Sequence, residues 1–209
     1  MSETPRTAAA RSAGKPPGLR ERVRATVRAE VVEVAHRLFT EQGFDRTTVD
    51  QIAAEVGLSR ASLFRYFGTK EDIVLGRLEE SGHRIAAELA SRPDDERPWE
   101  ALRRSFDALT RMNEAAPPEQ VLGYLRMLQE TPSLRARHYE KQLGWQELLV
   151  PEVARRLGVS ADRPDDPRAS ALAAAALACL DVASQGWVAC DGAVPLAELL
   201  DRAMGALEK

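Results

Sequence analysis

The sequence predicts an all-α protein, because apolar residues recur at helical spacing and no segment shows the alternation of a half-buried strand. Glycine and proline divide the 209 residues into stretches of helical length. Residues 1–78 contain 13 Lys/Arg and 10 Asp/Glu, whereas residues 79–209 contain 16 and 22. This asymmetry favours contact of the N-terminal part with a polyanion, since phosphate would repel the acidic remainder.

Residues 1–18 are expected to form a disordered basic tail, because they mix small residues with proline and arginine. They also lack the apolar region of a secretory signal. The tail and the arginines that follow it either contact DNA or are merely solvated. The first helix is expected from Arg20 to Gln42, with Gly43 as its stop. Its inward stripe consists of Val27, Val31, Val34, Ala35 and Leu38. This helix should build the core of a domain spanning residues 19–69.

Two short helices are expected to meet across Gly57. Thr48 suits an N-cap, and the residues after it have the spacing of a buried helical stripe, namely Val49, Ile52, Ala53 and Val56. Gly57 ends this helix, since glycine accepts the left-handed backbone of a helix C-terminus. Ser59 then caps a second helix, so the segment predicts a helix-turn-helix unit.

The second helix, from Arg60 to Phe67, is expected to have two chemically different faces. Helical projection places on the core side Leu63, Phe64 and Phe67. The opposite side carries Ala61, Ser62 and Arg65, with Tyr66 at the flank. A small, polar and cationic face suits the DNA major groove, because arginine donates two hydrogen bonds to guanine and serine pairs with several base edges.

Arg65 is the expected base-reading residue, and the expected phosphate contacts are Thr47, Thr48, Tyr66 and Lys70. The full expected DNA-contacting set is Thr47, Thr48, Ser59, Arg60, Ala61, Ser62, Arg65, Tyr66 and Lys70. Periodicity alone leaves an alternative open, in which the two helices form an ordinary hairpin with a solvated face.

The N-terminal part resembles the DNA-binding domain of the TetR family of transcriptional regulators over about Arg20 to Ile73, in the runs VVEVAHRLFTEQGF and TTVDQIAAEVGLSRASLFRYFGTKEDI. The markers are Ala35, Leu38, Phe39, Gly43, Phe44, Thr48, Ile52, Ala53, Val56, Gly57, Leu63, Tyr66, Phe67 and Lys70. The resemblance implies an all-helical homodimer, usually a repressor that leaves its operator when a small molecule enters the C-terminal domain. Many relatives carry histidine or another residue where Arg65 stands, so their operator sequences do not transfer.

Residues 70–209 predict a helical domain for ligand binding and dimerisation. A connecting helix is expected from Glu71 to Ser91, ended by the prolines of SRPDDERP. Further breaks are expected at 115–118, 131–132, 158–167 and 191–195, which gives a bundle of about five or six helices. This region is similar to a TetR subgroup described as binding acyl-CoA-like ligands, in the run VLGYLRMLQETPSLRARHYEKQLGWQELLVPEVARRLGV. A purely apolar effector is the alternative.

Large side chains of this region are candidates for the lining of a ligand cavity. The candidates are Phe106, Arg126, Met127, His138, Tyr139, Gln142, Trp145 and Trp187. Core packing is the competing interpretation for the apolar members. Solvated faces or salt bridges compete for the polar members, although a phosphate or thioester would also need such donors. Asp181 follows ten apolar residues, and exposure, pairing, an interface contact or ligand recognition would each explain it.

The homodimer is expected to form through the last two long helices, the alanine-rich one around Ala173 to Ala178 and the final one from Pro195 to Leu207. The cysteines, Cys179 and Cys190, are separated by about 16 Å along one helical pattern, too far for an internal disulfide. Packing is their expected role, and a contact between subunits is the alternative.

Together these features predict a DNA-binding transcriptional regulator, a ligand-released repressor that binds a near-palindromic operator as a homodimer. The alternatives are an activator of the same fold and a helical ligand-binding protein without operator specificity. An enzyme, a metal site or a cofactor is not expected, because the histidines are scattered and no catalytic pair, glycine-rich loop or metal-ligand spacing occurs in the sequence. The apolar run Ala171 to Leu180 is too short to cross a bilayer, so a cytoplasmic protein without a membrane partner is expected.

Overall fold

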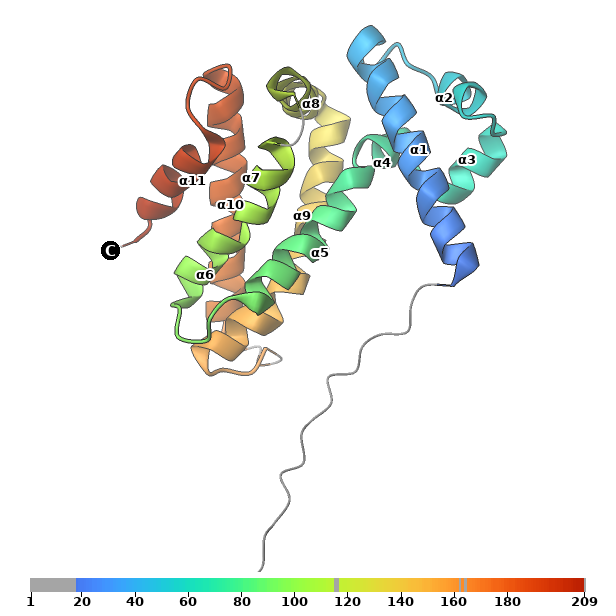
Figure 1. The fold of residues 1–209 in the computed structure, drawn as a ribbon. Helices are drawn as coiled ribbons and strands as arrows, with labels where there is room; N and C mark the ends of the chain where they lie inside the picture. Colours follow the sequence, from blue (N-terminus) through green and yellow to red (C-terminus); the bar gives the residue numbers. More distant parts are fainter. Residues whose placement is uncertain (1–17, 115–116, 162, 164, 209) are drawn as a thin grey trace, which may run out of the picture.

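The computed structural model describes residues 18–114, 117–161, 163 and 165–208, and these form eleven α-helices and no strand (Figure 1). The N-terminal helices are α1 (Leu19–Gln42), α2 (Val49–Glu55), α3 (Arg60–Tyr66) and α4 (Lys70–Val74). The remaining helices are α5 (Gly76–Ser91), α6 (Pro98–Ser105), α7 (Asp107–Glu114), α8 (Pro118–Glu130), α9 (Pro132–Leu157), α10 (Arg168–Ala189) and α11 (Leu196–Gly205). The predicted all-α class is confirmed. The predicted tail, residues 1–18, lies outside the described residues except for Gly18.

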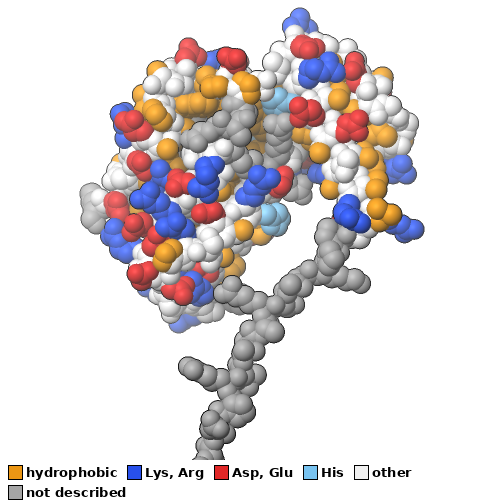
Figure 2. All heavy atoms as spheres, viewed as in Figure 1, with side chains coloured by type: hydrophobic (Ala, Val, Ile, Leu, Met, Phe, Trp, Pro, Cys, Tyr) orange, Lys and Arg blue, Asp and Glu red, His pale blue; other side chains and the backbone are white. Residues whose placement is uncertain are grey.

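The helices gather in two lobes, a small one of α1 to α4 and a larger one of α5 to α11 (Figure 1). On the face of the larger lobe that carries α5, α6 and α7, acidic and basic side chains alternate (Figure 2). Beneath this face, Arg103 is largely buried and pairs with Asp107 at 2.6 Å and with Asp201 of α11 at 2.5 Å.

The small lobe has its own core, and part of that core comes from the larger lobe. Within α1 the predicted inward residues Val31, Ala35 and Leu38 are buried. The second and third helices add Ile52, Ala53, Leu63 and Phe67. Leu128 of α8 and Leu134 of α9 belong to the same cluster of buried side chains. Packing of the helix-turn-helix unit therefore depends on two helices that lie more than fifty residues further along the chain.

The predicted continuous helix from Glu71 to Ser91 is wrong, because the chain bends at Leu75 between α4 and α5. Ile73, Val74 and Leu75 are all buried, and a straight helix with one apolar stripe cannot bury three consecutive residues on one side. Gly76 also packs tightly on α1, where an added Cβ would lie 2.7 Å from Val32 Cγ2. The bend thus lets the connector contact α1 before it enters the larger lobe.

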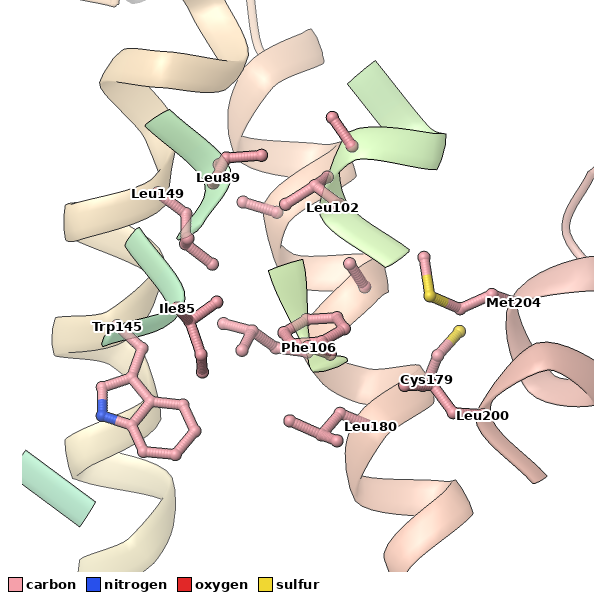
Figure 3. Packing of buried hydrophobic residues seen from close by; sticks show 14 of the residues in the cluster. Ile85, Leu89, Leu102, Phe106, Trp145, Leu149, Cys179, Leu180, Leu200 and Met204 are labelled. Atoms are coloured by element: carbon pink, nitrogen blue, oxygen red, sulfur yellow. The ribbon is translucent and has the colours of Figure 1, made fainter. Parts of the chain in front are cut away.

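The larger lobe encloses a second core made by α5, α6, α9, α10 and α11 (Figure 3). It contains one more helix than predicted, because the segment after Pro98 bends at Phe106 into α6 and α7. The Phe106 backbone N–H bonds to Arg103 O, three residues back, at 3.3 Å. Its ring is fully buried and lies in the middle of the cluster (Figure 3). The bend therefore places a large aromatic side chain at the centre of the bundle.

Two hydrogen-bonded anchors join α5 to α9. Near the start of α5, the Trp145 indole N–H donates to Leu78 O at 3.0 Å. At the end of α5, Arg156 donates to Leu89 O at 3.1 Å and to Arg92 O at 2.9 Å. These bonds satisfy carbonyl groups that a helix C-terminus leaves without intrahelical partners. The two helices are therefore joined near both ends of α5.

The alanine-rich helix α10 extends beyond the predicted ten-residue apolar run. It has 22 residues and a mean hydropathy of 1.4 over an 18-residue window, so its length and composition alone would suit a membrane span. However, its buried residues Ala173, Ala176 and Leu177 pack in the core of the larger lobe, as expected for the central helix of a bundle. Cys179 is buried in the same cluster, and burial raises the pKa of its thiol. Both cysteines are free thiols, so the predicted lack of an internal disulfide is confirmed.

Candidate nucleic-acid interface and effector cavity

Side-chain caps and one glycine hold the helix-turn-helix unit together. The Thr48 hydroxyl accepts a hydrogen bond from the Gln51 backbone N–H at 3.1 Å, and the Gln51 side chain accepts one from the Thr48 backbone N–H at 2.7 Å. Gly57 has a φ of 66°, which confirms the predicted left-handed residue. Ser59 caps α3, because its hydroxyl accepts from the Ser62 backbone N–H at 3.1 Å. The turn between α2 and α3 is thus specified by nearby residues.

The outward face of α3 carries the predicted Arg60, Ala61 and Arg65. The prediction that Phe64 faces the core is wrong, because this residue is 38% exposed. A seven-residue helix buries one narrow row, and Leu63 and Phe67 occupy that row at i and i+4 spacing. Phe64 lies beside Arg60, whose guanidinium is 5.5 Å from the ring centroid. The exposed face therefore combines two cations, a methyl group and an aromatic ring.

The polar side chains of this face form hydrogen bonds and ion pairs with nearby side chains, and DNA could take the place of these partners. Arg65 donates to Ser62 Oγ at 3.0 Å, and Ser59 Oγ lies 3.0 Å from the same oxygen. Arg60 pairs with Asp50 of α2 at 2.7 Å, and both side chains are about 60% exposed. Exposed ion pairs contribute at most about 1 kcal/mol. Both guanidinium groups can therefore exchange their present partners for base edges or phosphates.

Two arginines of α1 hold the C-terminal end of α3. Arg24 donates to Arg65 O at 3.4 Å, and Arg28 donates to Tyr66 O. The Arg28 guanidinium also lies 4.6 Å from the centroid of the Phe67 ring. Cations are favourable at a helix C-terminus, where the last carbonyl groups lack intrahelical partners. The arginine-rich start of α1 therefore orients the candidate reading helix, a role that the sequence did not indicate.

Of the predicted phosphate-contacting residues, Thr47 is buried, which contradicts its predicted contact, whereas Lys70 is partly exposed. The Thr47 hydroxyl donates to Gly43 O at 2.9 Å and to Leu38 O at 3.2 Å. Lys70 turns its ammonium inward to Phe44 O, and Nζ lies 4.1 Å from the centroid of the Phe44 ring. Burial lowers the pKa of Lys70. Both residues fix the loop between α1 and α2, because its backbone carbonyls need donors.

A cavity of about 170 Å³ lies where the two lobes meet. One lining residue comes from α1 and the others come from α5 and from α7 to α11. The described lining residues are His36, Leu78, Ser81, Leu109, Gln120, Val121, Tyr124, Leu125, Leu128, Gln129, His138, Gln142, Trp145, Leu180, Asp181, Ser184 and Leu196. Apolar walls with a few polar groups are typical of small-molecule sites.

Three of the eight predicted ligand residues line this cavity, namely His138, Gln142 and Trp145. Phe106 and Trp187 do not, because both are buried in the core of the larger lobe. Tyr139 is 46% exposed on the outside of α9. For these three residues the prediction of a ligand contact is wrong, and core packing or exposure explains them.

Arg126 and Met127 lie in a different place from the one predicted. They line a second, more open cleft of about 460 Å³ between α8 and the end of α1. Arg126 pairs there with Asp191 at 2.6 Å. Residues three and four positions apart share a helix face, and Tyr124, Leu125 and Leu128 already form the cavity-facing side of α8. Arg126 and Met127 are therefore directed away from the cavity by their position on the same helix.

The polar part of the cavity centres on His138 and Asp181. His138 Nε2 lies 3.0 Å from Gln142 Nε2 and 3.8 Å from Asp181 Oδ1. Asp181 also accepts hydrogen bonds from Tyr139 Oη at 3.2 Å and from Gln185 Nε2 at 2.8 Å. Burial lowers the pKa of His138, although the nearby Asp181 carboxylate opposes this shift. Burial thus favours the neutral imidazole of His138, which lies beside the Asp181 carboxylate.

Direct contacts connect the cavity with the small lobe. His36 of α1 stacks on Tyr124 of α8, with ring centroids 5.2 Å apart, and both rings line the cavity. Asp72 of α4 accepts a hydrogen bond from Arg137 of α9 at 3.0 Å. Burial would raise the pKa of Asp72, yet hydrogen bonds from Arg137 and Thr69 hold it below its usual value. These contacts join α8 and α9, which line the cavity, to α1 and α4 of the small lobe.

Sequence reasoning missed most of the cavity wall. One signal was present: Val121, Tyr124, Leu125 and Leu128 recur at helical spacing and mark the inward side of α8. His36, Ser81 and Ser184 carried no comparable signal, because they come from three different helices. Asp181 was noticed as an isolated carboxylate after an apolar run, and the structure places it in the lining.

The sequence matches two family profiles, which together cover most of the chain. Residues 31–76 match the family described as bacterial regulatory proteins, tetR family. Residues 96–209 match the MftR C-terminal domain. The first match spans the helix-turn-helix unit and the second spans most of the larger lobe.

Two characterised relatives and one solved structure are similar over most of their length. The chain is 32% identical to the HTH-type transcriptional regulator TcmR of Streptomyces glaucescens over 191 residues, which covers 89% of this chain and 82% of that protein. It is 28% identical to the HTH-type transcriptional repressor AcnR of Corynebacterium diphtheriae over 140 residues, 67% of this chain and 70% of that protein. The crystal structure of Thermus thermophilus FadR, a repressor in complex with lauroyl-CoA, matches with a TM-score of 0.56 at 25% identity, covering 87% of this chain and 93% of that one.

Proposed function

The chain belongs to the TetR family of bacterial regulatory proteins, and from this premise we propose that it is a ligand-released repressor that binds a near-palindromic operator as a homodimer. As a member of this family it is a transcriptional regulator. The observation that carries the proposal is the outward face of α3, which exposes Arg60, Ala61, Phe64 and Arg65 above a buried row. The division into a DNA-binding part, residues 19–69, and a ligand-binding part, residues 70–209, belongs to the same proposal.

In this proposal α3 enters the major groove and Arg65 reads a guanine through two hydrogen bonds. Ala61 permits close approach or meets a thymine methyl, and Phe64 adds an apolar contact of the same kind. Thr48, Ser59 and Tyr66 contact phosphates and fix the register. Support comes from the exposure of Arg65 and from the weak partners that it would exchange.

The homodimer would form through the last two long helices, with the outer side of α10 at the centre of the interface and the adjacent part of α9 beside it. Small apolar residues recur at helical spacing along the exposed side of α10, at Ala171, Ala174, Ala178, Val182 and Ala189. Val182 is 59% exposed, and Leu143 of α9 is 63% exposed. The outer residues of α11 are charged, so α11 would supply the rim of the interface instead of its centre. The face over α5 to α7 carries charged side chains of both signs (Figure 2).

The substitution Val182→Asp tests this interface, because it introduces a carboxylate in the middle of the apolar stripe. We expect a dimer for the wild-type chain and a monomer for the variant in sedimentation equilibrium. A variant that remains fully dimeric would exclude α10 as the interface.

The effector, an acyl-CoA-like or apolar small molecule, would bind in the 170 Å³ cavity and release the operator. It would do so by favouring a conformation in which the two α3 helices no longer match successive grooves. The stack of His36 on Tyr124 and the bond between Arg137 and Asp72 are the contacts through which the cavity would act on α1 and α4. DNA must then weaken effector binding by the same factor by which effector weakens DNA binding.

Two other functions of the same fold are kept as alternatives, an activator and a ligand-binding protein without operator specificity. No catalytic role is assigned, since the relatives are transcriptional regulators. A protein with this function works in the cytoplasm, where the DNA is. The predicted basic tail adds phosphate contacts only if its removal reduces the salt dependence of binding.

Selection of binding sites from fragmented genomic DNA by the purified protein tests the proposal. We expect a near-palindromic site, and for Arg65→Ala a loss of affinity of about 1–3 kcal/mol at one base pair in each half-site. Arg111→Ala is the matched control, because Arg111 is an exposed arginine of α7, a helix of the larger lobe outside both the helix-turn-helix unit and the proposed dimer interface (Figure 1). Equal, salt-sensitive binding to all fragments, unchanged in Arg65→Ala, would contradict operator recognition.

A further inference from the structure

The charge, shape and hydrogen bonds of the cavity restrict the kind of molecule that fits it. We propose that the effector is a neutral molecule of one or two rings whose hydroxyl group hydrogen-bonds to His138 at the Asp181 end of the cavity. This inference rests on the proposed binding of an effector in this cavity and names its chemical class. It replaces the acyl-CoA-like class that the sequence resemblance implies.

The cavity lacks the cations that an acyl-CoA would need. No lysine or arginine occurs among the described residues that line it, and its only carboxylate is that of Asp181. Coenzyme A carries several phosphate charges, and placing anions beside a carboxylate in a largely apolar wall is unfavourable. The lining therefore selects against anionic ligands and accepts neutral ones.

His138 supplies an unused hydrogen-bonding position. The residue is 92% buried, and its Nδ1 atom has no hydrogen-bond partner among the described residues. Nε2 faces the amide nitrogen of Gln142, which can only donate, so Nε2 accepts and the ring proton lies on Nδ1. Nδ1 is therefore a donor, and the oxygen of a hydroxyl group can accept its hydrogen bond. A buried polar atom without a partner destabilises the empty site, and a hydroxylated ligand would remove that penalty.

The size of the cavity sets the number of rings. Its volume of about 170 Å³ is close to that of an apolar cavity of about 150 Å³ that binds benzene, and it is below the range of roughly 300–1,000 Å³ for larger ligands. Leucine and valine side chains of α5, α7 and α8, together with the Trp145 indole, line the apolar part of the cavity. One or two fused rings fill this space without displacing the walls.

The open cleft beside α8 offers the competing arrangement. Arg46 and Arg126 line that cleft, and Tyr124 lines both it and the cavity. An acyl-CoA could place its phosphates near these arginines only if Arg126 left Asp191 and the acyl chain forced the cavity walls apart. Binding of an acyl-CoA would depend on Arg126, whereas binding of the hydroxylated ring depends on His138. Substitution of each residue therefore distinguishes the two arrangements.

Calorimetric titration of the full-length protein without DNA is the deciding experiment, with 2-naphthol, naphthalene, 2-naphthoate and lauroyl-CoA as probes. We expect 2-naphthol to bind about tenfold more tightly than naphthalene, the difference that one net hydrogen bond makes. We expect 2-naphthoate and lauroyl-CoA to bind more weakly than 2-naphthol. His138→Leu should abolish the preference for 2-naphthol over naphthalene, whereas His83→Leu, at an exposed position of α5, should preserve it.

The order of the four probes on the wild-type chain decides the inference even if a variant fails to fold. Tight binding of lauroyl-CoA that Arg126→Ala weakens, or equal affinity for 2-naphthol and naphthalene, would overturn it, as would a lack of binding by any probe. Operator release by 2-naphthol is measured separately on the protein–DNA complex. If 2-naphthol binds in a His138-dependent way but does not release the operator, the ligand class stands and the release mechanism fails.

Discussion

The α3 surface and the effector cavity differ in how their residues are brought together. The α3 surface is formed by consecutive residues, and caps and a glycine within that segment set its shape. The cavity takes its wall from seven helices, from His36 in α1 to Leu196 in α11. The comparison teaches that the exposed face of a short helix can be specified by nearby residues, whereas the lining of a cavity arises only from the packing of distant helices. The predictions below test how independent the two regions are.

The largest expected effect is that of Leu134→Ala, which removes a buried side chain of α9 from the core of the small lobe. We expect the free energy of unfolding to fall by about 2–5 kcal/mol, because the substitution leaves a cavity in a packed core. Denaturant unfolding measures the loss, and operator affinity should fall with it. Leu207→Ala, at an exposed leucine, is the control and should change stability by less than about 0.5 kcal/mol. An unaffected small lobe would show that α9 does not support it.

Gly82→Ala should act mainly on the larger lobe. An added Cβ would lie 2.3 Å from Trp145 Cδ1, so the indole must move and its bond to Leu78 O must weaken. Overpacking of this kind lowers the free energy of unfolding by about 1–3 kcal/mol and would distort the cavity wall. Gly144→Ala in α9 is the matched control, because nothing lies within 4 Å of its added Cβ, and it should stabilise the helix by about 0.5–1 kcal/mol. Thermal unfolding of both variants distinguishes these outcomes.

Thr48→Ala should separate the two regions most clearly. Loss of the cap of α2 should lower the free energy of unfolding by about 1 kcal/mol and weaken operator binding, since α2 supports α3. Ligand affinity in the isolated protein should not change, because the cap lies outside the cavity. Thr26→Ala, on the exposed side of α1, is the control. A parallel loss of ligand affinity would mean that the cavity depends on the local structure of α2.

The smallest expected effect is a pH dependence that originates in the cavity. The pKa of His138 is lowered by burial, so the unfolded chain binds a proton more readily than the folded one. Stability should therefore fall as pH drops below the ordinary histidine pKa of about 6.5. Unfolding measured at pH 7.5 and 5.5 should show a smaller pH effect in His138→Leu than in wild type. The pH effect should persist in His83→Leu, and an identical slope in all three chains would contradict the assignment.

Particular residues show why the sequence predicted some features and not others. Gly57, Thr48 and Ser59 were interpreted correctly, because capping and left-handed turns depend on neighbours within about four residues. Phe64 was wrongly predicted to face the core, because a helical projection does not show how many residues of α3 the neighbouring helices will cover. Thr47 was misplaced for a related reason, since only the folded loop shows that the Gly43 carbonyl takes the Thr47 hydroxyl as its donor.

By itself, the sequence determined the all-α class, the helix-turn-helix unit and the polar side of α3, because helical periodicity and capping are local. Only the tertiary structure decided which bulky side chains line the cavity and which fill the core, since Phe106, Trp145 and Trp187 have the same local pattern. It also decided that Leu128 and Leu134 belong to the small lobe and that His138 meets Asp181. These pairings join residues far apart in the chain, and their geometry depends on how all of the helices pack together.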